Sequence, residues 1–230
     1  MATTINRRKA LSLIAVTAAG GIVVPRNVFA QGASADAANL ITGADVCVIT
    51  PETTEGPFYF DPDLVRADIT EGRPGLSTRV RLQVVDTMCA PISGARVDIW
   101  HCDASGNYSG YSGQPGGDAR GETFMRGTQF ADDDGVVEFA TVYPGWYPGR
   151  TPHIHLKVFL DDATLMTGQL FFPDDVSDRV YASVAPYATQ GQRDRRNDND
   201  GIARQAGAAA VAEVEELADA YLVQMIIGVG

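Results

Sequence analysis

The chain has 230 residues and a formal charge of −11, with 45% hydrophobic and 20% charged residues. This composition supports a buried core and excludes a largely disordered chain. The acidic balance argues against nucleic-acid binding and against polybasic membrane binding, because both need clustered Lys and Arg. The 24 Gly and 12 Pro favour strands and turns over helices.

The first residues have the pattern of an export signal. A basic Arg7-Arg8-Lys9 cluster precedes an apolar run, and Val28-Phe29-Ala30 fits a small-residue cleavage site. The paired arginines favour the twin-arginine route, with an ordinary secretory signal or a retained membrane anchor as alternatives. We therefore expect an export signal over residues 1–30 and a flexible leader over 31–49. The protein would be periplasmic or extracellular, without stable membrane association after cleavage.

Residues 50–230 are expected to form one all-β domain of the β-sandwich class, with little helix. Apolar residues alternate with polar ones in several short runs, which is typical of half-buried strands. The expected strands cover 80–84, 97–101, 128–130, 136–142, 153–160, 166–172 and 221–229. Asp133-Asp134-Gly135 is a hairpin signal between two of them. A short helix is expected within 176–187, and the Ala-rich stretch 206–219 has a helical pattern.

The three cysteines, Cys47, Cys89 and Cys102, permit one disulfide and leave one thiol in an oxidising compartment. We expect Cys47 to pair with Cys89, which would tie the N-terminal arm to a turn, although sequence alone leaves the pairing open. The lack of a Cys-x-x-Cys spacing argues against a zinc site.

A His-Ile-His sequence within an expected strand is the first sign of chemistry. Side chains at i and i+2 project from one face of a strand, so His153 and His155 have a metal-ligand arrangement. Tyr108 and Tyr147 stand where a carboxylate ligand would be expected. A phenol has a pKa near ~10 and is a poor ligand for divalent ions, whereas a trivalent ion can hold it as phenolate. Two phenols and two imidazoles therefore suggest Fe(III), and the alternatives are a solvent-exposed His pair and ordinary packed tyrosines.

Other candidate residues have simpler interpretations. We expect His101 to have a structural hydrogen-bonding role. Core or rim packing is expected for Tyr111, Tyr143, Trp100 and Trp146. The Asp198-Asn199-Asp200-Gly201 segment resembles a small calcium loop but lacks the following Glu, so a solvated turn is favoured.

Four segments together resemble the intradiol ring-cleavage dioxygenases, which include catechol, hydroxyquinol and protocatechuate dioxygenases. The segments are 50–59 (TPETTEGPFY), 94–104 (GARVDIWHCDA), 106–108 (GNY) and 144–155 (PGWYPGRTPHIH). The resemblance runs from about Thr50 to Asp175 and is weaker at Asn197 to Ile202 and in the last expected strand. Its Tyr, Tyr-x-x-Arg-x-x-His-x-His order is highly specific. It implies a prealbumin-like β-sandwich with long active-site loops.

The resemblance also implies roles for individual residues. One Fe(III) per chain would be held by Tyr108, Tyr147, His153 and His155, and Tyr147 would leave the iron when the substrate chelates it. Arg150 would stabilise negative charge on the bound catecholate. Gln169 would hydrogen-bond in the pocket, and the arm at 56–59 would line the substrate mouth.

The activity that the resemblance implies is cleavage of a small aromatic diol by O₂ to a cis,cis-muconate-type diacid. No Gly-x-Gly-x-x-Gly fingerprint indicates a nicotinamide or flavin cofactor. The alternative is a metal-free binding module, because residues 84–99 also resemble the prealbumin-like repeats of secreted proteins. A dioxygenase fold that has lost its iron is a further alternative. The sequence leaves open which catechol derivative is the substrate and whether the chain forms a homo-oligomer.

Overall fold

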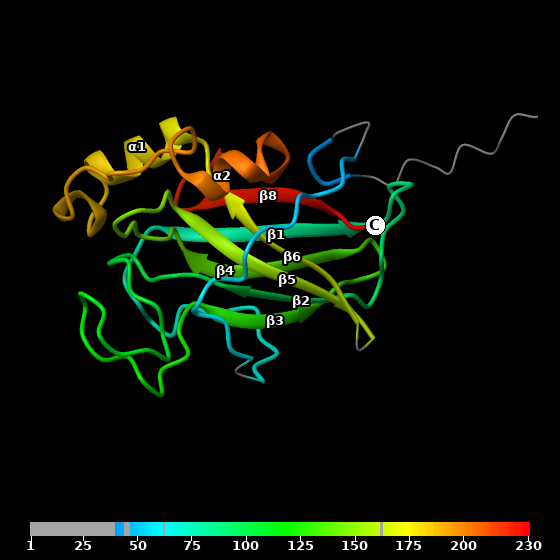
Figure 1. The fold of residues 1–230 in the computed structure, drawn as a ribbon, viewed down its shortest axis with the longest axis horizontal. Helices are drawn as coiled ribbons and strands as arrows, with labels where there is room; N and C mark the ends of the chain where they lie inside the picture. The colour runs from blue at the N-terminus through cyan, green and yellow to red at the C-terminus, as the bar shows by residue number, and fades with distance from the viewer. Residues whose placement is uncertain (1–39, 44–46, 62, 162) are drawn as a thin grey trace, which may run out of the picture. The chain divides into compact units, whose positions relative to one another are not determined.

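The computed structural model describes residues 40–43, 47–61, 63–161 and 163–230. The expected export signal at 1–30 lies outside these residues. Two four-stranded sheets form the sandwich, ordered β4-β1-β8-β7 and β3-β2-β5-β6. The strands are β1 (Ser77–Val85), β2 (Arg96–Trp100), β3 (Arg126–Phe130), β4 (Val136–Val142), β5 (His153–Leu160), β6 (Ala163–Phe171), β7 (Glu213–Glu216) and β8 (Tyr221–Gly228). The predicted β-sandwich is confirmed, and Figure 1 shows the α-helices outside the two sheets.

The core lies between the sheets and follows the alternation seen in the sequence. Each central strand turns one set of alternate residues inward, as a period of two requires. The buried inward set includes Val80, Leu82, Val97, Ile99, Phe139, Ile154, Leu156, Val223 and Met225. The opposite face of the β3-β2-β5-β6 sheet is therefore available for other side chains.

Strand register places three polar or aromatic side chains in a row on that outer face. His155 of β5 lies opposite Trp100 of β2 and opposite Gln169 of β6. Directly opposed residues of antiparallel strands project from the same face. The sheet thus presents Trp100, His155 and Gln169 side by side.

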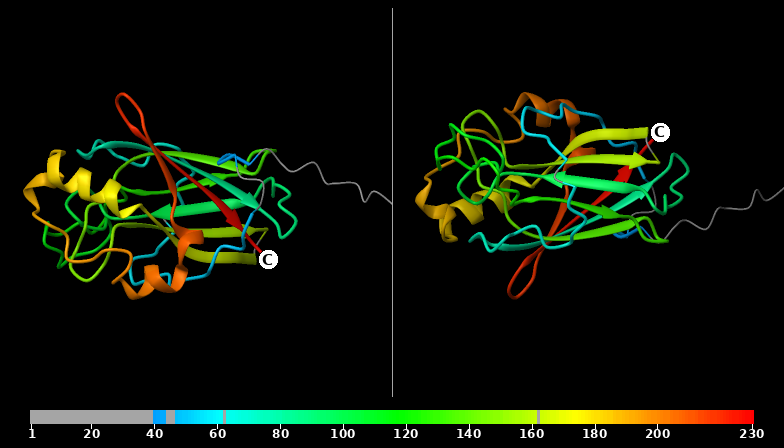
Figure 2. Two further views of the ribbon diagram at one scale, coloured as in Figure 1. Left: turned by 90° about the horizontal axis from the view of Figure 1, so that it is seen from above. Right: turned by 90° about the horizontal axis from the view of Figure 1, so that it is seen from below.

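The connections next to this face are long and irregular. Segments 101–125 and 143–152 contain no regular strand or helix among their residues. Helix α1 (Asp174–Ser183) follows β6 directly. Figures 1 and 2 show the 101–125 segment (green) and α1 (yellow) at the same end of the sandwich, away from the C-terminus. This end carries the candidate site described below.

The predicted helix at 206–219 is wrong. Helix α2 (Gly201–Ala206) ends before this stretch, and Ala208–Ala210 form one 3₁₀ turn. Gly207 terminates α2 with a φ of 68°, a left-handed conformation that favours glycine. Val214 then pairs with Val223 in the β7–β8 hairpin, which projects from the sheets in Figure 2. Strand pairing has overridden the helix propensity of the alanines.

The described end of the expected leader is attached to the sandwich. Cys47 and Cys89 form a disulfide, which confirms the expected pairing, and Cys102 is a buried free thiol. Ile49 bridges to Gly228, and the backbone N–H of Ile41 donates to Gln83. Ile41, Cys47 and Ile49 are thus in contact with the sandwich. Among the described residues, no helix has the length and apolar character needed to cross a membrane.

Candidate metal centre

Two imidazoles project from the outer face at the start of β5. His153 and His155 alternate with Ile154 and Leu156, whose side chains belong to the core. Both histidines are only 2% exposed. The His-Ile-His alternation therefore places two imidazoles on one buried surface, as strand periodicity predicts.

Two tyrosines reach the same place from different loops. Tyr108 lies in the segment between β2 and β3, and Gln114 fixes its backbone by accepting from its N–H and donating to its C=O, both at 2.6 Å. Tyr147 lies in the segment between β4 and β5. The loops approach backbone to backbone, since a Cβ on Gly106 would lie 2.5 Å from the Trp146 carbonyl oxygen. A Cβ on Gly145 would equally lie 2.5 Å from the carbonyl oxygen of Ala104.

Tyr108, Tyr147, His153 and His155 form one compact group, called the Tyr/His cluster below. Nε2 of His153 lies 3.1 Å from Nε2 of His155, 3.1 Å from Tyr147 Oη and 3.3 Å from Tyr108 Oη. The two phenol oxygens are 3.4 Å apart. Four donor atoms thus converge on a common point.

Hydrogen bonding and burial set the protonation states of the cluster. Nδ1 of His153 lies 2.7 Å from the carbonyl oxygen of Thr151, so Nδ1 carries the proton and Nε2 presents a lone pair. Burial lowers the pKa of His153 to about 3 and also lowers that of His155, which keeps both rings neutral. Burial raises the pKa of Tyr147 to about 12 and raises that of Tyr108. Both phenols are therefore protonated at neutral pH unless a strong cation faces them.

The donor set fits a metal ion. Two ligand atoms each about 2 Å from one ion lie about 3 Å apart, which matches the observed spacing. Within the described chain, no group of three or more His, Cys, Asp or Glu side chains could hold a metal. The Tyr/His cluster is a different kind of site, because tyrosines supply half of its donor atoms. Both imidazoles are neutral, and the tautomer of His153 is fixed by its bond to the Thr151 carbonyl, so these rings are ready to coordinate. The phenols become good ligands only for a strong Lewis acid.

Arg150 and Gln169 stand beside the cluster and contact each other. Nη2 of Arg150 donates to Gln169 Oε1 at 2.5 Å, and its Nη1 lies 3.4 Å from His153 Nε2. Gln169 is fully buried and also donates to the carbonyl oxygen of Thr54. Tyr147 and Arg150 are partly exposed, whereas Tyr108, His153, His155 and Gln169 are buried.

The arm that precedes β1 covers the other side of the cluster. Phe58 stacks on Tyr108 with ring centroids 4.3 Å apart, and Trp100 stacks on His155 at 4.9 Å. Gly56 comes so close that a Cβ there would lie 3.2 Å from Cε1 of His155. Gly56 and Phe58 of the arm are thus part of the wall around the Tyr/His cluster.

The structure also assigns the remaining candidates. His101 is fully buried, with Nδ1 bonded to the Cys102 carbonyl and Nε2 to Thr141 Oγ1, as its expected structural role requires. Tyr143 is a buried packing residue that bonds Ser177.

The expected solvated turn at Asp198–Gly201 is wrong for Asp200. This residue is 2% exposed and forms an ion pair with Arg150 at 2.8 Å. One sequence signal pointed to a structural role for Asp200, because an Asp directly before a short helix is a typical N-cap. Its ion pair with Arg150 has no such signal.

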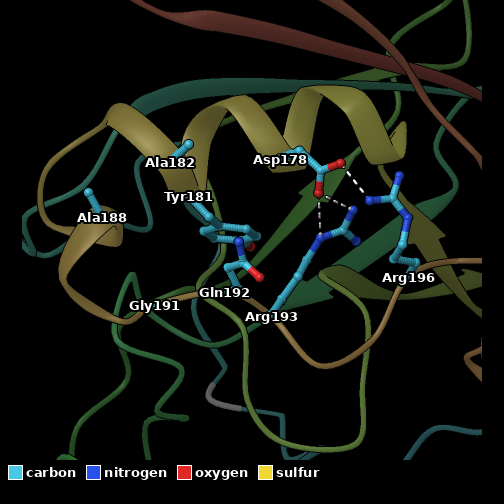
Figure 3. Close-up of a pocket in the computed structure, with 8 residues that line it drawn as sticks. All are labelled: Asp178, Tyr181, Ala182, Ala188, Gly191, Gln192, Arg193 and Arg196. Carbon is cyan, nitrogen blue, oxygen red and sulfur yellow. Dashed lines mark hydrogen bonds and ion pairs between the residues drawn. The ribbon is translucent and has the colours of Figure 1, made fainter.

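A cavity of about 600 Å³ lies between helix α1 and the segment 188–196. Its lining includes Asp178, Tyr181, Gln192, Arg193 and Arg196, and Asp178 pairs with both arginines (Figure 3). No member of the Tyr/His cluster lines this cavity. Arg193 also donates to Thr151 Oγ1, so the cavity wall contributes to holding the loop before His153.

Comparison with known proteins agrees with this geometry. The family described as "Dioxygenase" matches residues 51–205. The catechol 1,2-dioxygenase of Pseudomonas sp. (strain EST1001) is 29% identical over 69% of this chain and 58% of its own length. The chlorocatechol 1,2-dioxygenase of Rhodococcus opacus is 28% identical over 55% of this chain and 57% of its own length. The chain thus spans little more than half the length of these relatives.

A solved structure matches over nearly its full length. The intradiol ring-cleavage dioxygenase from Tetranychus urticae is 34% identical, with a TM-score of 0.75 over 80% of this chain and 95% of that protein. The dioxygenase domain of a carbohydrate-binding fusion from Streptomyces sp. SirexAA-E is 30% identical, with a TM-score of 0.59 over 79% of this chain and 97% of that domain. The chain therefore belongs to the intradiol ring-cleavage dioxygenase family.

Proposed function

We propose that this protein is an oxidoreductase that holds one Fe(III) per chain and cleaves a catechol-type diol with O₂ to a cis,cis-muconate-type diacid. The convergence of two phenols and two neutral imidazoles at 3.1–3.4 Å is the observation that carries the proposal. Tyr108, Tyr147, His153 and His155 would hold the iron. When bound, the ion acts as a Lewis acid that ionises the phenols and makes the chelated diol reactive towards O₂.

The chain's own residues have distinct tasks in this proposal. Tyr147 is the more exposed of the two tyrosines, which suits a ligand that yields its place to the diol. Burial raises the pKa of Tyr147 to about 12, so its Oη would hold one of the two protons that a chelating diol gives up, and the second would pass to solvent. Arg150 directs a fixed positive charge at the space beside His153, where it offsets negative charge on the bound diol. The buried Trp100 and the partly buried Phe58 pack against the cluster and limit the access of water.

We also propose that the protein is exported after removal of residues 1–30. The Cys47–Cys89 disulfide supports this, because such bonds persist in oxidising compartments.

Isotope labelling tests the reaction. Purified protein is incubated with catechol under ¹⁸O₂, and the product is examined by mass spectrometry. An intradiol dioxygenase gives a diacid in which both atoms of O₂ are incorporated. Unchanged catechol with an iron-loaded protein would show that the site binds metal without this activity. A metal-free protein that binds catechol reversibly would instead favour a binding module.

A further inference from the structure

We propose that Asp200 is a positioning residue whose carboxylate holds the Arg150 guanidinium so that Nη1 points at the Tyr/His cluster. This inference rests on the proposed function and adds a residue to it. Asp200 lies fifty positions from Arg150 in sequence, and their side chains meet at 2.8 Å.

Two of the three guanidinium nitrogens of Arg150 donate hydrogen bonds to fixed acceptors. Nε donates to Asp200 Oδ2, and Nη2 donates to Gln169 Oε1. Only Nη1 remains directed at the cluster, 3.4 Å from His153 Nε2. The side chain of Arg150 is 17% exposed whereas that of Asp200 is 1% exposed. Without its buried anchor, the long Arg150 side chain could turn towards solvent.

Asp200 is itself held rigidly. Its Oδ1 accepts from the backbone N–H groups of Ile202 and Ala203, so Asp200 caps the first turn of α2. Burial alone would raise the pKa of this carboxyl, but hydrogen bonds from Thr151, Ala203 and Arg150 hold it below its usual value. The group is thus ionised at neutral pH and supplies a negative charge to the partly buried guanidinium of Arg150.

The same carboxylate also reaches the peptide that orients a cluster ligand. Oδ2 accepts from the backbone N–H of Thr151 at 2.9 Å, and the Thr151 carbonyl accepts from His153 Nδ1. One buried oxygen therefore links Arg150 with the backbone next to His153. Outer partners of this kind fix the orientation of the groups they contact.

Asp200→Asn separates this role from helix capping. Asn caps a helix about as well as Asp, so its oxygen can still accept from Ile202 and Ala203. Its amide nitrogen would then face Arg150 Nε and the Thr151 N–H. All three groups are hydrogen-bond donors, so both hydrogen bonds to this position would be lost. Asp198→Asn is the matched control, because Asp198 is an exposed carboxylate in the same segment.

The test uses the iron-loaded full-length protein. We expect Asp200→Asn to keep its iron and visible band and to lose roughly 10- to 100-fold in kcat/KM, mainly in kcat. Spectral titration should show little change in the affinity for catechol. In an Arg150→Ala background, adding Asp200→Asn should cost much less rate than in the wild-type background, because only the Thr151 contact remains to be lost. Asp198→Asn should behave as the wild type.

Two results would overturn the proposal. One is wild-type turnover by Asp200→Asn, and the other is an equal loss of rate with or without Arg150. If Asp200→Asn does not fold, chemical rescue decides the matter: free guanidinium should restore Arg150→Ala saturably, and no rescue in a protein that keeps its iron band would contradict the role. A wild-type protein without iron and without catechol turnover would instead count against the proposed function itself.

Discussion

A change at Arg150 should affect the rate of the reaction without affecting the binding of iron or of the diol. Arg150 touches His153 and Gln169 yet cannot be a metal ligand, because a cation does not coordinate a cation. Its fixed charge matters most when negative charge builds on the reacting diol. We expect Arg150→Ala to keep iron and colour and to bind catechols with a visible spectral shift.

The same variant should turn over about 100- to 1000-fold more slowly, as measured by steady-state kinetics. Arg150→Lys should recover only part of the loss, since a point charge replaces a planar fork. Wild-type turnover by Arg150→Ala would contradict the proposed role.

The histidines give a second prediction at this scale. His153→Ala or His155→Ala removes one of four converging donors, so most bound iron should be lost, as measured by iron per chain. His101→Ala is the control, because both ring nitrogens of His101 are used in bonds to Cys102 and Thr141. It should lower stability and leave the iron in place. Equal iron loss from His101→Ala would mean that the ligand assignment is wrong.

The sequence identified the four cluster residues but not their support. His153 and His155 follow from strand periodicity, whereas Tyr108 and Tyr147 were singled out by the motif order. Asp200 was missed because it meets Arg150 only through the fold, from a segment whose acidic and amide residues resemble a solvated turn. Contacts of this kind have no local sequence signature.

Two loops join strand β5 in building the site. Segments 101–125 and 143–152 pass so closely that only glycine fits at their crossing. Strands β1, β2, β4, β5 and β8 were largely predictable, because alternation reports which face is buried. The Ala-rich stretch at 206–219 was misread, although Glu213 and Glu215 alternate with Val214 in the manner of the strand that forms there.

Gly106→Ala tests the close approach of segments 101–125 and 143–152. Gly106 has a φ of 85°, and an added Cβ would meet the Trp146 carbonyl at 2.5 Å. We expect a loss of about 2–5 kcal/mol in the free energy of unfolding, and a protein that holds less iron because the two tyrosines are pushed apart. Denaturant unfolding and iron analysis measure both effects.

Gly113→Ala is the matched control for this experiment. Gly113 lies in the same segment with a φ of 75°, but an added Cβ would find no other atom within 4 Å. It should show only the backbone strain, about 1–2 kcal/mol, and normal iron content. Equal behaviour of the two variants would show that the close approach of the loops is unimportant.

At the scale of the whole molecule, the disulfide fastens the N-terminal segment to the sandwich. Cys47 and Cys89 are separated by 42 positions, and closing a loop of this length in the unfolded chain is worth up to ~4 kcal/mol. We expect the Cys47→Ser/Cys89→Ser variant to lose about 2–4 kcal/mol of unfolding free energy and to keep its iron. Reductant should destabilise the wild type similarly and leave the variant unchanged. No difference between the two proteins would contradict a structural role for this bond.

The central claim is that two tyrosines and two histidines hold Fe(III) in this fold. Metal analysis together with the visible spectrum of the purified protein tests it most directly. The account predicts one iron per chain and a red to burgundy colour, from charge transfer between the phenolates of Tyr108 and Tyr147 and the ion. A colourless protein that contains stoichiometric zinc and is still active would contradict it.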